Sequence, residues 1–152
     1  MEIKINDQFI IATLRHFQRP MIEFSYKLSS VVYNDRDGNY IEYIGMGVKN
    51  KNYRISISIN NINEINILLI RPKKYIHMIR VIFFLFLAFV GLRRINPGQV
   101  GVDSVELKSL QNFIPNKLDE DNIEIVIKQS IDFIQQHLMS VIKGEVWIEE
   151  PR

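Results

Sequence analysis

Histidine is the side chain in this sequence best suited to chemistry at neutral pH, because imidazole titrates there and can act as a general base or bind a metal. The chain has three histidines, at His16, His77 and His137. None falls in a His-Glu-x-x-His spacing, which would bring two imidazoles to one face of a helix. The histidines therefore predict no metal site, and each is better interpreted as a structural residue.

Two carboxylates in the polar segment 34–39 suggest calcium chemistry at first sight. Asp35 and Asp37 are followed by Gly38, as in the first half of a calcium-binding loop. That loop needs a bidentate Glu at its twelfth position, and the sequence has none there. Asn, Asp and Gly also favour tight turns, so this segment predicts a hairpin turn.

Motifs for cofactors and nucleophiles are incomplete. The segment Gly45-Met46-Gly47 is not a dinucleotide-binding loop, and in an expected strand it indicates a bulge or a close packing point. The sequence contains no Gly-x-Ser-x-Gly elbow, no Walker loop and no cysteine. We therefore expect no enzymatic activity, no cofactor and no metal site.

Tyrosines that could stack on nucleic-acid bases gather in the first third of the chain, near several basic residues. They are Tyr26, Tyr33, Tyr40, Tyr43 and Tyr53. Aromatic residues are also ordinary strand formers. We therefore expect no direct binding of nucleic acid.

Charge is placed unevenly, although the net charge is only +2. Residues 71–102 carry six basic and no acidic side chains, whereas residues 103–150 carry ten acidic and four basic ones. Such a surface could imitate phosphate and steer a basic partner, but acidic residues are also common at helix starts. The candidate partner-binding residues are Asp119, Glu120, Asp121, Glu124 and Asp132.

The hydrophobic pattern indicates how these residues are positioned. Apolar residues between 9 and 17 recur at helical spacing, and Pro20 is expected to end this helix. From 23 to 70 the period changes to two, which indicates four strands joined by short Asn-rich turns. A short helix capped by Asp103 or Ser104 should follow. The last long helix, opened by residues 119–121, should bury an apolar stripe made of Ile123, Ile127, Ile131, Ile134, Leu138 and Val141.

These elements predict a single α+β domain over residues 1–152. It should contain an N-terminal helix, a four-stranded antiparallel sheet, and C-terminal helices packed on one face. Gly144 is expected to end the last helix, and the apolar tail after it should dock back on the domain.

The twelve residues Val81–Leu92 contain no polar side chain, and ten of them are large and apolar. Leaving these ten in water would forfeit roughly 15–30 kcal/mol, at about 1.5–3 kcal/mol each. A membrane span needs about 20 apolar residues, and an extension to 75–92 takes in the polar residues His77 and Arg80. We expect a buried helix, and the alternative is a small membrane-anchored protein with a short span at residues 75–92.

The order of elements also resembles a known group of proteins. The strands read EFSYKLSSVVYNDRDGNYIEYIGMGV, KNYRISISI and EINILLIRP, and the closing helix reads IDFIQQHLMSVIKGEVW. This arrangement resembles immunity proteins of bacterial polymorphic-toxin and contact-dependent growth inhibition systems. In several such families a similar sheet precedes a helix that ends in a Leu-x-Gly-acidic pattern, to which Val141–Glu145 is similar.

This resemblance implies a small cytoplasmic non-enzyme that binds one cognate toxin domain and blocks its active site. It implies no cofactor, and contact with a membrane is expected only if residues 75–92 span one. The interfaces of these families diverge, so the resemblance assigns no binding residue in this chain.

Overall fold

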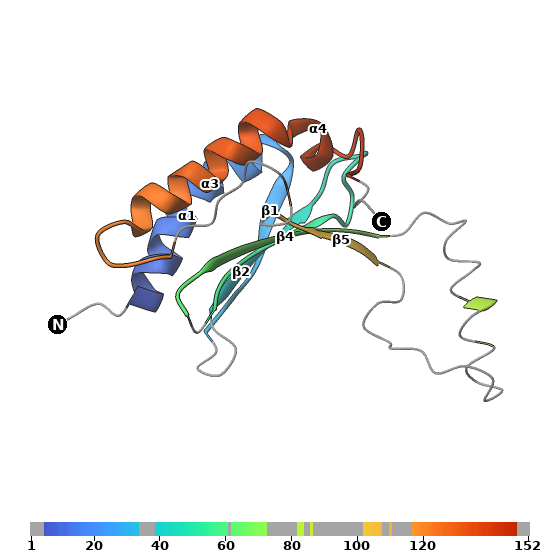
Figure 1. The fold of residues 1–152 in the computed structure, drawn as a ribbon. Coiled ribbons are helices and arrows are strands. Elements are labelled where there is room, and N and C mark those ends of the chain that lie inside the picture. The colour runs from blue at the N-terminus through green and yellow to red at the C-terminus, as the bar shows by residue number, and fades with distance from the viewer. Residues whose placement is uncertain are drawn as a thin grey trace.

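A computed structural model of the protein describes residues 5–33, 39–60, 62–72, 82–83, 86, 102–107, 110 and 117–148. The helices and strands follow the order α1 (Ile5–Glu23), β1 (Tyr26–Val32), β2 (Tyr40–Gly45), β3 (Arg54–Ile59), β4 (Ile65–Pro72), β5 (Val102–Glu106), α3 (Ile123–His137) and α4 (Met139–Ile142). Figure 1 shows the α+β arrangement, with α1 and α3 side by side over one sheet.

The strands form one antiparallel sheet in the order β1-β2-β3-β4-β5. This confirms the predicted meander, but the predicted number of four strands is wrong, because β5 adds a fifth. The sequence predicts a helix capped by Asp103 at this place. Instead, the Asp103 carboxylate accepts a hydrogen bond from Arg71 Nε of β4 at 3.0 Å, and Val105 is buried. Pairing with β5 also satisfies backbone groups of β4 that would otherwise need another partner.

The first helix continues past Pro20 to Glu23, so the prediction that Pro20 ends it is wrong. Proline removes one backbone donor from a helix but keeps its own carbonyl as an acceptor. Phe24 N donates to Pro20 O at 3.0 Å, which completes the following turn. Burial of Met21 and Phe24 in the core offsets the lost hydrogen bond.

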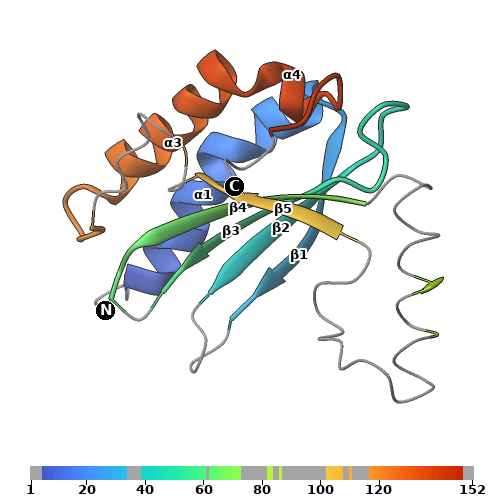
Figure 2. The same ribbon diagram turned by 45° about the vertical axis from the view of Figure 1, so that its right-hand side comes forward.

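The core lies between the sheet and the two long helices. In β3 and β4, every second residue is buried and the residues between are mostly half-buried. The predicted stripe on the last helices is confirmed, because all of its members are buried: Ile123, Ile127, Ile131, Ile134, Leu138 and Val141. Figure 2 shows that α1 and α3 cover the same face of the sheet, and that no described helix lies on the opposite face.

The connection between β4 and β5 contains the apolar run. Because these strands are antiparallel neighbours, the chain leaves and re-enters the sheet at one end. Most of Val81–Leu92 and of 75–92 lies outside the described residues. Ile82, Phe83 and Phe86 are described as helical and are 62, 60 and 60% exposed, whereas a buried helix was expected there. Among the described residues, no helix has the length and apolar character of a membrane span.

Candidate partner-binding surface

Three consecutive acidic residues form an exposed turn before α3, which we call the acidic turn (residues 119–121). Asp119 Oδ1 accepts hydrogen bonds from the backbone N–H groups of Asp121 at 3.1 Å and Asn122 at 2.8 Å. In return, Asn122 Oδ1 accepts from Asp119 N at 2.9 Å, and Asn122 Nδ2 donates to Lys117 O at 2.9 Å. These reciprocal bonds hold the turn in one shape, and the helix therefore begins just after it.

The acidic turn borders a pocket of about 420 Å³ between α1, the β3–β4 connection and the segment before α3. Its lining residues are Ile5, Asn63, Lys117, Leu118, Asp119 and Glu120. Leu118 N donates to Asn63 O at 2.7 Å, which fastens the turn to the sheet. The structure thus brings Asp119 and Glu120 to one hollow, with Asp121 next to them and also exposed.

Glu124 lies in the first turn of α3 and is bound by α1. Its two carboxylate oxygens pair with Arg15 Nη1 and His16 Nε2, each at 2.5 Å. This carboxylate therefore links the two helices. Of the five candidate residues, it is the one whose charge is most engaged inside the fold.

Asp132 stands apart from the acidic turn. It lies nine residues beyond Ile123, which is roughly 14 Å along the axis at 1.5 Å per residue. Its side chain is half-buried, whereas the three residues of the acidic turn are exposed. The candidate residues predicted from the sequence are therefore one cluster of three, one interhelical link and one separate carboxylate.

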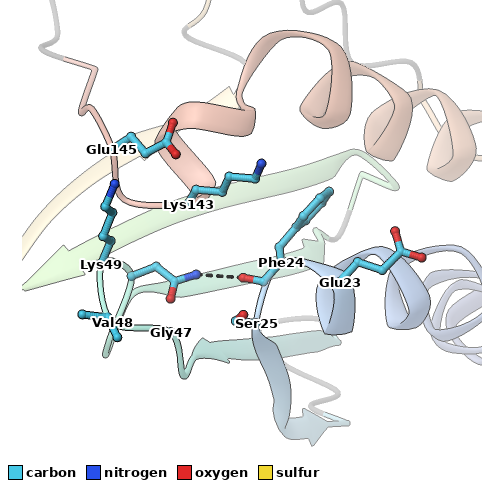
Figure 3. Close-up of a pocket in the computed structure, with 9 residues that line it drawn as sticks. Glu23, Phe24, Ser25, Gly47, Val48, Lys49, Lys143 and Glu145 are labelled. Atoms are coloured by element: carbon cyan, nitrogen blue, oxygen red, sulfur yellow. Dashed lines mark hydrogen bonds between the residues drawn. The ribbon is translucent and has the colours of Figure 1, made fainter.

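A second polar site, not predicted from the sequence, is centred on Asn50 in the β2–β3 loop. Asn50 is only 3% exposed. Its Nδ2 donates to Phe24 O at 2.9 Å and to Ile142 O at 3.3 Å (Figure 3, which draws the first bond). Tyr26 Oη also donates to Ile142 O, at 2.9 Å. One asparagine thus joins the end of α1, the end of α4 and the loop between them.

Burial changes the acidity of two tyrosines near this region. Burial, with a smaller contribution from nearby Tyr53, raises the pKa of Tyr26 well above its usual value. Burial also raises the pKa of Tyr43 to about 12. Both hydroxyls are thus held in the neutral form. Their burial also removes them from the exposed aromatic surface that nucleic-acid binding would need.

A pocket of about 280 Å³ lies beside Asn50. Its lining residues are Glu23, Phe24, Ser25, Gly47, Val48, Lys49, Asn50, Lys143 and Glu145. The prediction of close packing at Gly45 and Gly47 is confirmed: a Cβ at Gly45 would lie 2.1 Å from Asn50 O, and one at Gly47 would lie 2.5 Å from Asn50 Oδ1. The glycines are the sequence signal for this site, because they mark where another group comes close.

Comparison with known protein families, curated proteins and solved structures finds no match for the chain. Among the described residues, no group of three or more His, Cys, Asp or Glu side chains is placed to hold a metal ion. Function is therefore inferred from the surfaces described above.

Proposed function

We propose that the protein is a small non-catalytic immunity-type protein that binds and neutralises a cognate bacterial toxin domain in the cytoplasm. The observation that carries the proposal is the acidic turn, which is both exposed and fixed in shape by its own hydrogen bonds. The order of elements, which resembles that of known immunity proteins, also supports it.

A fixed turn is well suited to partner binding, because little conformational entropy is lost when the partner arrives. Glu120 and Asp121 present carboxylates to solvent, where they can steer a basic surface toward the protein. The pocket beside them is bordered by the apolar residues Ile5 and Leu118. It could receive one side chain of the partner as an anchor, and such anchors usually dominate binding energy.

The test measures association with a candidate toxin domain encoded in the same gene cluster. In the double variant Glu120→Lys and Asp121→Lys, association should slow and its dependence on ionic strength should flatten. Both side chains are exposed and neither bonds through its carboxylate to the described residues in the contacts above, so stability should change by no more than about 0.5 kcal/mol.

The matched control is Glu23→Lys with Glu145→Lys, which makes the same charge change at the other end of α3 and α4. Association should stay closer to that of the wild type in this control. Equal rates and equal salt dependence for wild type and the Glu120/Asp121 variant would remove the acidic turn from the interface. Absence of any complex with the neighbouring toxin would contradict the proposed function itself.

A second candidate function, a small membrane-anchored protein with its attachment at 75–92, is favoured by one observation. Ile82, Phe83 and Phe86 are exposed, and the segment 71–102 that contains them carries six basic and no acidic side chains. Basic residues near an apolar segment are attracted to anionic lipid. Recovery of the protein only in the detergent-extracted membrane fraction would favour this function, and recovery without detergent would oppose it.

A further inference from the structure

We propose that the pocket beside Asn50 binds a primary amide, through a hydrogen bond from the ligand's NH₂ group to Asn50 Oδ1. The shared chemistry is a neutral carboxamide, whether on a free small molecule or on a Gln or Asn side chain of another protein. The site is distinct from the acidic turn, because the 15 residues of α3, about 22 Å at 1.5 Å per residue, separate them.

The state of the Asn50 side chain determines what the pocket requires. Both donated hydrogen bonds of Nδ2 go to backbone carbonyls, of Phe24 and Ile142, so the amide orientation is fixed. The other amide atom, Oδ1, is buried and has no hydrogen-bond partner among the described residues. Buried acceptors are nearly always paired, so this oxygen calls for a donor from outside the fold.

Gly47 leaves the approach to this oxygen open. A Cβ at this position would lie 2.5 Å from Asn50 Oδ1 and 3.3 Å from Ser25 Cβ, between the two. The absence of that carbon leaves space for an N–H group to reach the acceptor. Val48, next along the chain, is fully exposed, so the loop can adjust without disturbing the core.

The charges around the pocket favour a neutral ligand over an ion. The lining includes two carboxylates, Glu23 and Glu145, and two ammonium groups, Lys49 and Lys143, so its formal charge is zero. Figure 3 shows Lys49 on one side of the pocket and Glu23, at the end of α1, on the other. Burying an ionised group next to an amide oxygen would cost far more than burying a neutral donor. The lysine ammonium groups can donate to the carbonyl of a bound carboxamide.

The size of the pocket restricts the ligand to a small molecule or a single side chain. Pockets for larger ligands usually span about 300–1,000 Å³, and this one is about 280 Å³. A carboxamide on a short aliphatic stem, such as propionamide or the side chain of glutamine, has suitable chemistry and size.

The experiment titrates the full-length protein with three molecules of similar shape: propionamide, propionate and propylammonium. Amide chemical shifts of Ser25, Gly47 and Asn50, including the Asn50 side-chain NH₂, report on binding. Propionamide should move these resonances, with an affinity about tenfold or more above that of either ion. Equal effects of all three molecules, or no effect of propionamide at these residues, would overturn the proposal and leave Oδ1 to an ordered water.

Variants and a second pair of ligands complete the test. Gly47→Ala should weaken binding of propionamide by about tenfold or more, because its methyl group would occupy the approach to Oδ1. Val48→Ala, which removes an exposed side chain from the same loop, should bind as the wild type does. Unchanged binding in Gly47→Ala would contradict the proposal. If this variant does not fold, the preference for propionamide over propionate in the wild type still decides the question.

Free glutamine and N-acetylglutamine methylamide distinguish the two sources of the amide. Stronger binding of free glutamine would indicate a small-molecule ligand, because its ammonium and carboxylate groups would pair with the charges around the pocket. Stronger binding of the capped form would indicate a side chain of a partner protein. A protein partner at this site would rest on the proposed function, whereas binding of propionamide does not, so the two can fail separately.

Discussion

The guanidinium carbon of Arg71 lies 4.4 Å from the centre of the Trp147 indole ring. Arg71 is near the end of β4 and also pairs with Asp103 of β5, so the contact fastens the C-terminal tail where the chain leaves and re-enters the sheet. Tyr53 meets the same indole edge-on, with ring centroids 6.0 Å apart. The prediction that the tail docks back on the domain is confirmed by these contacts.

Replacing Arg71 should loosen the tail. We expect Arg71→Met to lower the free energy of unfolding by about 1–2 kcal/mol, because it removes a cation–π contact and leaves Asp103 without its partner. Trp147 is the only tryptophan, so its fluorescence reports directly on the tail and should shift toward that of an exposed indole. Arg19→Met, which removes a highly exposed arginine, should leave both quantities nearly unchanged. An unshifted emission spectrum in Arg71→Met would show that the tail docks without this contact.

Two buried tyrosines should respond in opposite ways to loss of their hydroxyl groups. Tyr26 donates to Ile142 O at 2.9 Å, so Tyr26→Phe should destabilise the fold by about 1–2 kcal/mol. The hydroxyl of Tyr43 has no hydrogen-bond partner among the described residues, so Tyr43→Phe should be neutral or stabilising. Denaturant unfolding of both variants at pH 7 measures the difference. A Tyr43→Phe variant less stable than Tyr26→Phe would contradict this assignment of partners.

The raised pKa of Tyr43 should make the fold sensitive to alkali. Its pKa is about 12 in the folded protein and 10.0 in its unperturbed state, so the unfolded chain releases the proton first as pH rises. The contribution is fully present below pH 10 and is lost between pH 10 and 12, by up to about 3 kcal/mol at 1.36 kcal/mol per pH unit. Unfolding free energies measured from pH 9 to 12 should therefore fall less steeply in Tyr43→Phe than in the wild type. Parallel curves would show that Tyr43 ionises normally.

Local patterns in the sequence were sufficient to predict much of the fold. The alternating isoleucines of β3 and the stripe of α3 are correct because apolar period reports which side of an element is buried. Strand β5 was missed because it is short and begins with a polar pair that also suits a helix cap, and its pairing with β4 is decided across a long connection. Asn50 was interpreted only as a turn residue, since its partners Phe24 and Ile142 are 26 and 92 residues away.

The candidate site was predicted in part for the same reason. Exposure of Asp119–Asp121 follows from three adjacent charges, and the structure places them together before α3. The engagement of Glu124 could not be predicted, because Arg15 and His16 lie more than a hundred residues earlier in the chain. Contacts of this kind depend on how α1 packs against α3, and no local pattern encodes that geometry.

Removal of the Glu124 carboxylate should weaken the link between α1 and α3. We expect Glu124→Gln to lower the free energy of unfolding by about 0.5–1 kcal/mol, a modest value because Arg15 and Glu124 are 61 and 42% exposed and water screens the pair. The loss should shrink as salt concentration rises, since screening already weakens the wild-type pair. Glu120→Gln, which removes the same charge from the acidic turn, should not change stability. Equal stability of the two variants at low salt would show that Glu124 contributes no link between the helices, and it would return this carboxylate to the surface available for a partner.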